Sequence, residues 1–186
     1  ALEQAVVSGK RTGLDLLALL IDLDNFKRIN DLLGHAAGDR LLRLVAKRLA
    51  ACVRAMDTLC RQGGDEFVLL LTEIEQPQDA ARVVEKLRAA LAVPYLIGGH
   101  DLRVTPSMGI SVFPDDGFDV DTLMHKADTA MFHAKASGRD NFLFFRPAIS
   151  ITGTMLYIRQ PLSAGRNRKI TLSATFSRIS FLFSFP

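Results

Sequence analysis

The stretch LLALLIDLDN, residues 16–25, decides the fold class of this chain of 186 residues. It is apolar without interruption as far as residue 21, and Asp22 and Asp24 then follow. An apolar run of this length is typical of a strand that is buried on both faces of a sheet. We therefore predict a buried strand over residues 16–23, whose end carries acidic groups to the edge of the sheet.

Helical patterns occupy much of the chain after this strand. Gly34 and Gly138 stand where two of these patterns stop, and glycine commonly ends a helix because it adopts the left-handed conformation there. The sequence predicts helices over residues 26–33, along an apolar stripe from Leu41 to Val53, from Pro77 onward, and over residues 120–137.

Two glycine pairs, Gly63-Gly64 and Gly98-Gly99, predict two hairpins, because glycine tolerates the positive φ of a tight turn. Pro106 indicates an edge or a bulge in the strand that contains it. Strands that alternate with helices predict the α/β or α+β class with a mixed sheet. The further strands expected are residues 58–61, 67–71, 95–97, a short one at Leu102, 104–112 and 142–145.

Composition excludes several classes of protein. Hydrophobic residues make up 48% and charged residues 23%, which is ordinary for a globular domain with a sizeable core. No apolar run approaches the roughly 20 residues of a membrane span, and no secretory signal opens the chain. Two cysteines without CxxC spacing give neither a disulfide scaffold nor a cysteine zinc site. We therefore expect a cytoplasmic chain.

The net charge of +3 is unevenly distributed along the chain. Residues 151–186 contain five basic side chains and no acidic one, which leaves 18 basic against 20 acidic side chains in residues 1–150. A slightly acidic body is not the basic face that a nucleic acid polymer requires, so we expect no such partner. Because residues 149–186 show no helical stripe, we expect a disordered or non-native tail behind a domain of residues 1–148.

Two pairs of acids form the first candidate site. Asp22 and Asp24 end the buried strand, and Asp65 and Glu66 lie at the tip of the first hairpin. If the two strands are neighbours, these carboxylates converge, and a cation is needed to offset their repulsion. Oxygen ligands favour Mg²⁺ or Mn²⁺. The alternative is that the first pair caps the next helix and the second pair is solvated.

Further polar residues suggest a nucleotide. Asn30 and Asp39, in the same segment as Lys27, offer donors and acceptors that match a guanine edge, although an acid near a helix start is favourable anyway. Lys135 and Arg139 could bind triphosphate oxygens, or could simply offset the dipole at the end of the last helix.

Arg54 and Asp57 lie just before the first hairpin. An Arg at this distance from an Asp can form a local ion pair of little energetic value. It can equally present its planar fork to guanine O6 and N7. Spacing alone leaves both possibilities open.

Several motifs, taken in order, resemble the GGDEF domain of diguanylate cyclases. Residues 63–67 spell GGDEF, and DLDNFKRIND, GHAAGD, SMGIS and ADTAMFHAKASGR fit the same family at residues 22–31, 34–39, 107–111 and 127–139. The resemblance runs from about Leu16 to Phe145. Several motifs in register are far more specific than one five-letter string.

The resemblance implies a fold and a reaction. The fold is a ferredoxin-like core, similar to the palm of nucleotide cyclases and polymerases, with a mainly antiparallel sheet flanked by helices. The reaction is the condensation of two GTP molecules into cyclic di-GMP with release of pyrophosphate. Since each subunit would hold one GTP, the resemblance also implies a homodimer.

The resemblance further implies a role for each candidate residue. Asp22, Asp65 and the Leu23 carbonyl would bind Mg²⁺ or Mn²⁺. Glu66 would be a second metal ligand or help to deprotonate the ribose 3′-hydroxyl. The remaining implied roles are guanine recognition by Asn30 and Asp39, phosphate binding by Lys27, Lys135 and Arg139, and product inhibition by cyclic di-GMP at Arg54 and Asp57.

The chain departs from the family pattern in three places. The family's opening segment, Asp-x-Leu-Thr-Gly-Leu-x-Asn-Arg, is not found, and Asp140 stands where Asn is commoner. The tail does not resemble the EAL phosphodiesterase domain of tandem relatives. We therefore expect a fragment of a longer regulator. A non-catalytic module that binds GTP or cyclic di-GMP, or a palm that uses another base, are the alternatives, and the intact GGDEF letters favour the enzyme.

Overall fold

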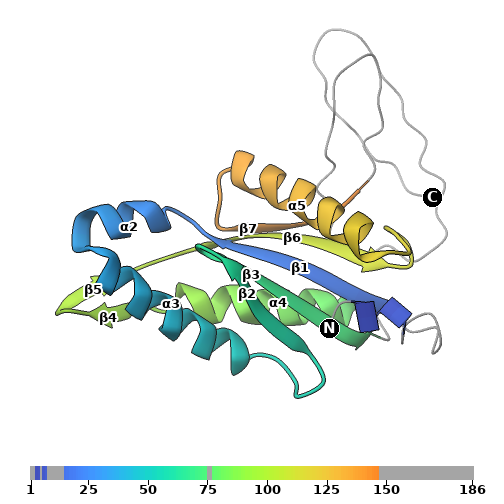
Figure 1. Cartoon of the computed structure of the whole chain (residues 1–186), viewed down its shortest axis with the longest axis horizontal. Helices are drawn as coiled ribbons and strands as arrows, with labels where there is room; N and C mark the ends of the chain where they lie inside the picture. Colours follow the sequence, from blue (N-terminus) through green and yellow to red (C-terminus); the bar gives the residue numbers. More distant parts are fainter. Residues whose placement is uncertain (1–2, 5, 8–14, 75–76, 147–186) are drawn as a thin grey trace, which may run out of the picture.

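The computed structural model describes residues 3–4, 6–7, 15–74 and 77–146, and in this part of the chain five strands form the central sheet. The strands lie in the order β2-β3-β1-β6-β7, so that β1 is the middle one (Figure 1). Their bounds are β1 (Asp15–Leu23), β2 (Thr58–Gly63), β3 (Glu66–Ile74), β6 (Pro106–Phe113) and β7 (Asn141–Phe144).

The prediction that residues 16–23 form a strand buried on both faces is confirmed. Every residue of β1 after Asp15 is buried, and the strand is antiparallel to β3 on one side and to β6 on the other. β2 and β3 form the hairpin around Gly64, and β7 joins the sheet parallel to β6. The sheet is therefore mixed but mainly antiparallel.

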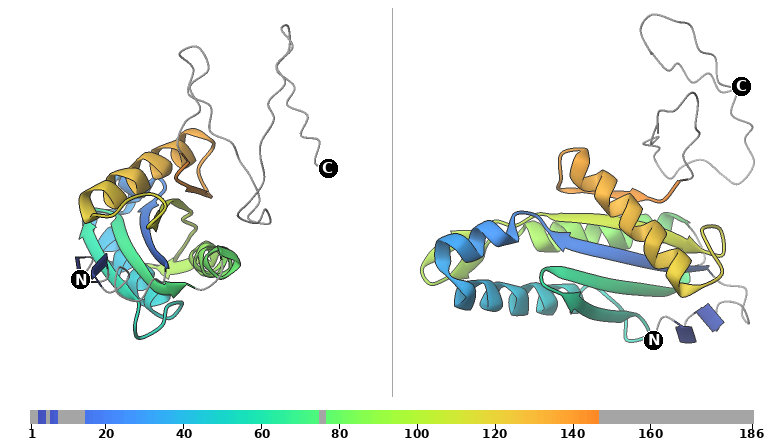
Figure 2. Two further views of the ribbon diagram at one scale, coloured as in Figure 1. Left: turned by 90° about the vertical axis from the view of Figure 1, so that its right-hand side faces the viewer. Right: turned by 45° about the horizontal axis from the view of Figure 1, so that its top comes forward.

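Helices cover both faces of the sheet, as Figure 2 shows. α3 and α4 pack on one face, and α5 packs on the other against β1, β6 and β7. The order of strands and helices along the chain gives the ferredoxin-like, palm-like arrangement that the sequence predicts. The helices are α2 (Phe26–Leu33), α3 (His35–Ala50), α4 (Pro77–Ala92) and α5 (Val120–Ala136).

The alternation of side chains along β1 divides the core between these two layers. Leu19 and Ile21 belong to the larger apolar cluster, which includes the buried faces of α3 and α4. Leu20 points to the other face and packs on Ala127 and Met131 of α5. Asp22 continues the α5 side of this alternation, which places it beneath the helix that carries Lys135.

Close packing of α5 on the sheet depends on Gly109 in β6. A Cβ atom at Gly109 would lie 2.0 Å from the carbonyl oxygen of Ala127 and 2.3 Å from the backbone nitrogen of Met131. Any side chain at this position would push the helix away from the strand. Gly109 therefore sets the height of α5, and with it that of its basic last turn, above the acidic end of β1.

The second predicted hairpin is also present but stands apart from the central sheet. β4 (Tyr95–Ile97) and β5 (His100–Leu102) pair with each other around Gly98-Gly99. In Figure 1 they lie at the end of the molecule near α2. Both glycine-pair predictions are thus confirmed, in different surroundings.

The prediction of an edge or bulge at Pro106 is wrong. β6 is an interior strand between β1 and β7, and Pro106 is its first residue, opposite Leu23. A first position tolerates proline because its missing N–H interrupts no ladder beyond that point.

The third helix ends earlier than its apolar stripe predicts. α3 stops at Ala50, and Cys52 and Val53 lie beyond it, although both still pack against the core. The Asp57 carboxylate accepts a hydrogen bond of 2.8 Å from the backbone N–H of Arg54. Such local side-chain acceptors compete with helical hydrogen bonds, so the contact at Arg54 disfavours a longer helix.

No helix in the part of the chain that the structure describes is long and apolar enough to cross a membrane. The expected tail of residues 149–186 lies outside the described residues, as does the exact end of the domain predicted at residue 148.

Candidate active site

The acids of β1 and of the first hairpin meet at one edge of the sheet. In the β1–β3 ladder Asp22 is directly opposite Glu66, and Asp65 precedes Glu66 in the turn. Residues that face each other across a ladder have side chains on the same face of the sheet. The predicted convergence of Asp22 with Asp65 and Glu66 therefore agrees with the register.

Burial and neighbouring charges act on the Asp22 carboxyl in opposite directions. Burial raises the pKa of Asp22 above its usual value, and the negative charges of Asp65 and Glu66 raise it further. Lys135 opposes both, since its Nζ lies 2.7 Å from Asp22 Oδ2. The net pKa remains raised, chiefly because of burial, so Lys135 does not fully offset the cost of an ionised Asp22 at this edge.

The donor set at this edge fits a hard divalent cation shared with a substrate. Two carboxylates, those of Asp22 and Asp65, stand near the Leu23 carbonyl. This carbonyl faces the β3 side of β1, because the hydrogen bond from the Asp24 N–H to the Thr105 carbonyl makes Leu23 and Pro106 a non-hydrogen-bonded pair. Among the described residues no group of three or more His, Cys, Asp or Glu forms a complete metal cage. Mg²⁺ characteristically takes one or two carboxylates and completes its shell with water and phosphate oxygens.

Asp24 does not join this acid cluster, although the sequence grouped it with Asp22. Its carboxylate is buried and accepts hydrogen bonds from Ser107 and Thr105. The capping alternative fails as well, because the residue before α2 is Asn25, in the left-handed conformation, and no side chain caps the helix. Asp22 and Asp24 thus have separate environments.

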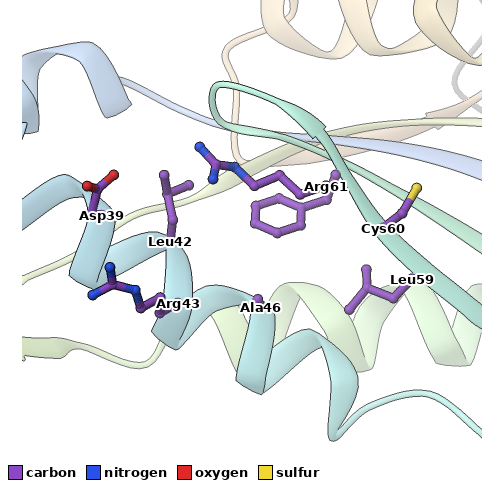
Figure 3. Close-up of a pocket in the computed structure, with 8 residues that line it drawn as sticks. Asp39, Leu42, Arg43, Ala46, Leu59, Cys60 and Arg61 are labelled. Atoms are coloured by element: carbon purple, nitrogen blue, oxygen red, sulfur yellow. The ribbon is translucent and has the colours of Figure 1, made fainter.

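A hollow of about 430 Å³ lies between α3 and the first hairpin (Figure 3). Leu42 and Ala46 of α3 face Leu59 of β2 across it, so its walls are largely apolar. Charged groups stand along its borders, with Asp39 near the start of the helix. Apolar walls with a few polar groups are typical of sites for small molecules. The residues that line it are Asp39, Leu42, Arg43, Ala46, Leu59, Cys60, Arg61 and Phe67.

Asn30 approaches the same region from α2. A Cβ atom at Gly38 would lie 1.8 Å from Asn30 Oδ1, so only glycine lets this side chain pack against the backbone next to Asp39. Asn30 Oδ1 is buried and has no hydrogen-bond partner among the described residues. Buried polar atoms without partners are rare and are typical of sites that await a ligand.

The helix-dipole alternative for Asp39 is weakened by the position of the helix. α3 begins at His35, and no acid lies in its first turn, so Asp39 is one turn further along. The favourable effect of an acid falls off within the first turn. Asp39 is also exposed at the border of the hollow, where it can accept hydrogen bonds from a ligand.

The predicted phosphate-binding residues are only partly brought together. Lys135 pairs with Asp22, and Arg139 Nε lies 3.8 Å from Asp24 Oδ1, so both basic groups stand at the acidic end of β1. Lys27 is exposed on the first turn of α2. Because α5 ends at Ala136, Arg139 lies beyond the helix and the dipole alternative does not apply to it.

Arg54 and Asp57 lie away from this edge, at the far end of the first hairpin. The Asp57 carboxylate accepts hydrogen bonds from the backbone N–H groups of Arg54, at 2.8 Å, and of Thr72, at 3.3 Å. The contact that joins the pair thus uses the backbone of Arg54 rather than its guanidinium, which leaves the exposed fork available for a ligand.

Sequence reasoning missed three residues of this region. Arg43 follows Asp39 by one helical turn and lines the same hollow, a spacing that could have indicated it. Arg61 uses Nε and a terminal nitrogen to donate hydrogen bonds of 2.9 and 2.8 Å to the Gly64 carbonyl. Phe132 is largely exposed and lines a second hollow of about 270 Å³ beside Glu66 and Lys135.

Comparison with known proteins agrees with this geometry. The family model described as "Diguanylate cyclase, GGDEF domain" matches residues 1–141. MucR of Pseudomonas aeruginosa, described as a bifunctional diguanylate cyclase/cyclic di-GMP phosphodiesterase, is 46% identical over 149 residues, which make up 80% of this chain and 22% of MucR.

Two solved structures are similar to the whole described fold. The crystal structure of the GGDEF domain of YfiN (TpbB) from Pseudomonas aeruginosa matches with a TM-score of 0.76 and 34% identity, over 78% of this chain and 91% of that one. The GGDEF domain of DgcB from Caulobacter crescentus, in complex with c-di-GMP, matches with a TM-score of 0.69 and 25% identity, over 77% of this chain and 85% of that one.

Proposed function

From the premise that this chain belongs to the GGDEF family of diguanylate cyclases, we propose that it condenses two GTP molecules into cyclic di-GMP. Membership confirms the resemblance found in the sequence, and with it the palm-like fold and the nucleotidyltransferase class. The chain spans only 22% of the length of MucR, so the activity of any longer protein is part of the proposal.

The reaction makes two phosphodiester bonds in turn. In each half, the 3′-oxygen of one GTP forms a bond to the α-phosphorus of the other. The bond from that phosphorus to the bridging oxygen breaks, pyrophosphate leaves, and the hydroxyl proton passes to a base. Catalysis of such an in-line displacement is mostly positioning and neutralisation of charge.

The observation that carries this proposal is the meeting of Asp22 with the Asp65-Glu66 turn beside a base-sized hollow. In the proposed complex the guanine enters the hollow, where Asp39 and Asn30 bind its edge. Its phosphates then reach the acidic end of β1, where Lys135, Arg139 and Lys27 bind them. In this proposal Glu66 is a further metal ligand or accepts the 3′-hydroxyl proton.

Mg²⁺ or Mn²⁺ is the cofactor in this proposal, held by Asp22, Asp65 and the Leu23 carbonyl. When bound, it would neutralise charge on the phosphate oxygens. The two neighbouring acids support a cation here, because the negative charges of Asp65 and Glu66 raise the pKa of Asp22 beyond the larger effect of burial.

A homodimer follows from the chemistry. The base hollow and the acidic edge of one chain together hold one GTP in this proposal, so the second GTP comes from a second copy across a two-fold axis. A monomer in this proposal binds GTP but does not close the ring.

Arg54 and Asp57 form a separate site for cyclic di-GMP in the proposal. The complex of the DgcB domain supports product binding by this fold. The exposed Arg54 fork, with Asp57 holding its backbone, supports this location. We also place the chain in the cytoplasm, where GTP is available, as one domain of a longer regulator.

Chromatography of the products formed from GTP and Mg²⁺, at increasing concentrations of the 186-residue chain, tests the proposal. We expect cyclic di-GMP and pyrophosphate, with a rate that rises more steeply than the protein concentration because the active species is a dimer. Asp65→Ala is the inactive control. Absence of product under forced dimerisation, together with tight GTP binding by calorimetry, would replace the enzyme by the non-catalytic binding module.

A further inference from the structure

Asp24 is buried beside the proposed site although it faces neither the base hollow nor the acid cluster. The residue is 4% exposed and its side chain 1% exposed, against 12% for the side chain of Asp22. Its backbone N–H donates to the Thr105 carbonyl at 2.8 Å, which extends the end of β1 along the segment before β6. A buried carboxylate is costly unless it is well hydrogen-bonded.

The Asp24 carboxylate is fully engaged by partners from two other segments. Oδ1 accepts a hydrogen bond of 2.6 Å from Ser107 Oγ, and Oδ2 accepts one of 2.7 Å from Thr105 Oγ1. Oδ2 also accepts one of 3.0 Å from the backbone N–H of Asp140, and Arg139 Nε lies 3.8 Å from Oδ1. These partners leave the carboxylate little capacity for a metal or a substrate.

The segment held by Asp24 has an unusual backbone. Arg139 and Asp140 have φ angles of 62° and 44°, in the left-handed region that residues other than glycine seldom adopt. Such a conformation persists only where surrounding interactions fix it. Here the hydrogen bond from the Asp140 N–H to Asp24 helps to hold it, together with the hydrogen bond from the Arg139 N–H to the Ala134 carbonyl. The Asp24 carboxylate also attracts the Arg139 guanidinium.

We propose that Asp24 is a positioning residue that orients Arg139 toward the phosphates of the bound nucleotide. The inference rests on the function proposed above. Arg139 is half-exposed, with 54% of its side chain accessible, and a long side chain of this kind samples many rotamers when it is not held. Asp24 limits those rotamers from the buried side and leaves the rest of the planar fork for phosphate oxygens.

A purely structural role for this buried network is the competing explanation, and a double-mutant cycle separates the two. Asp24→Asn and Arg139→Ala are made singly and together, and GTP binding is measured by calorimetry with Ca²⁺ in place of Mg²⁺. We expect Asp24→Asn to weaken GTP binding about tenfold in the parent chain. In the Arg139→Ala background we expect less than a twofold further loss, because the residue through which Asp24 acts is gone.

Guanosine, which has no phosphate, serves as the second ligand, and we expect Asp24→Asn to leave its affinity unchanged. Ser111→Ala is the matched control, since its buried hydroxyl donates to the Leu123 carbonyl and has no part in the Asp24 network. It should lower the thermal midpoint without changing GTP affinity. If Asp24→Asn does not fold, Thr105→Val, which removes one hydrogen bond from the same carboxylate, is tested in its place with a smaller loss expected.

The inference is overturned if Asp24→Asn weakens GTP binding equally with and without Arg139, or leaves it unchanged in a folded chain. A parent chain that binds no GTP would instead overturn the proposed function, so the two failures are distinguishable.

Discussion

The molecule contains two hairpins built on a pair of adjacent glycines, and only one of them carries the proposed chemistry. Gly98 and Gly99 both have positive φ and join two short strands that pair with nothing else in the described part of the chain. Gly64, with φ of 49°, begins the turn between β2 and β3 and places Asp65 and Glu66 beside β1.

The difference shows that the residues needed for a tight turn do not by themselves bring acidic side chains to a site. Asp101 in the second hairpin has the same side chain as Asp65, but it is exposed and faces no second acid at the end of a buried strand in the described part of the chain. Asp65 acts on the Asp22 carboxyl because β3 is the neighbour of β1. The neighbouring strand, rather than the glycine pair, makes the first hairpin a site.

The largest expected contrast is between the acids of the two turns. Asp65→Ala should reduce turnover of GTP on the order of 10³-fold or more, because it removes a proposed ligand of the charge-neutralising cation. Asp101→Ala should leave turnover unchanged. Both variants should retain the circular dichroism of the parent chain. Normal cyclic di-GMP formation by Asp65→Ala would contradict the metal assignment.

Arg61 should give the next largest effect, because it ties β2 to the turn that carries Asp65. Arg61→Ala removes both hydrogen bonds to the Gly64 carbonyl, and we expect turnover at saturating GTP to fall about tenfold while the thermal midpoint changes little. Arg103→Ala, an exposed arginine next to the second hairpin, is the control.

Arg61→Lys distinguishes the geometry of this contact from its charge. Lysine keeps the positive charge but lacks a fork that can donate twice to one carbonyl. We expect it to resemble Arg61→Ala, and full activity of the lysine variant would show that charge alone is needed.

The two turn glycines should be equivalent in stability and different in function. A Cβ atom at Gly64 or Gly98 would meet no atom within 4 Å, but both residues have φ in the left-handed region. Alanine at either position should therefore lower the free energy of unfolding by about 1 kcal/mol in denaturant titrations. Only Gly64→Ala should also lower turnover. Equal activity of the two variants would contradict the conclusion that only the first hairpin contributes to catalysis.

The smallest expected effect is on stability, and it concerns Asp22 at the end of β1, opposite the first hairpin. A raised pKa in the folded state means that ionised Asp22 costs stability once the pH exceeds its ordinary value near 4. Without divalent ions, Asp22→Asn should therefore be the more stable chain at neutral pH, although Lys135 offsets part of the cost of the ionised carboxylate.

Denaturant titrations at several pH values check the sign of this effect. The advantage of Asp22→Asn should grow from about pH 4 up to the raised pKa and stay constant above it, and Asp101→Asn should show no such trend. A deficit that grows with pH would mean that the ion pair with Lys135 outweighs burial.

The positions of Asp22 and Asp24 show the limit of prediction from the local sequence pattern. They are two residues apart, so alternation places them on the same face, and the sequence predicts one cluster. The left-handed Asn25 and the hydroxyls of Thr105 and Ser107 instead give Asp24 its own buried network. Those hydroxyls come from a segment some 80 residues further along the chain, which no local pattern can indicate.

Local chemistry was sufficient wherever the cause is local. The apolar run of β1 determines burial on both faces, because each apolar side chain favours removal from water. The glycine pairs determine two tight turns, because the steric limits on φ apply to single residues. Only the tertiary structure decided that β3 lies beside β1, that α5 rests on Gly109, and that Lys135 reaches Asp22. Those positions depend on the register between distant strands and on close packing between the helices and the sheet. Both involve residues far apart in the sequence, so no local pattern specifies them.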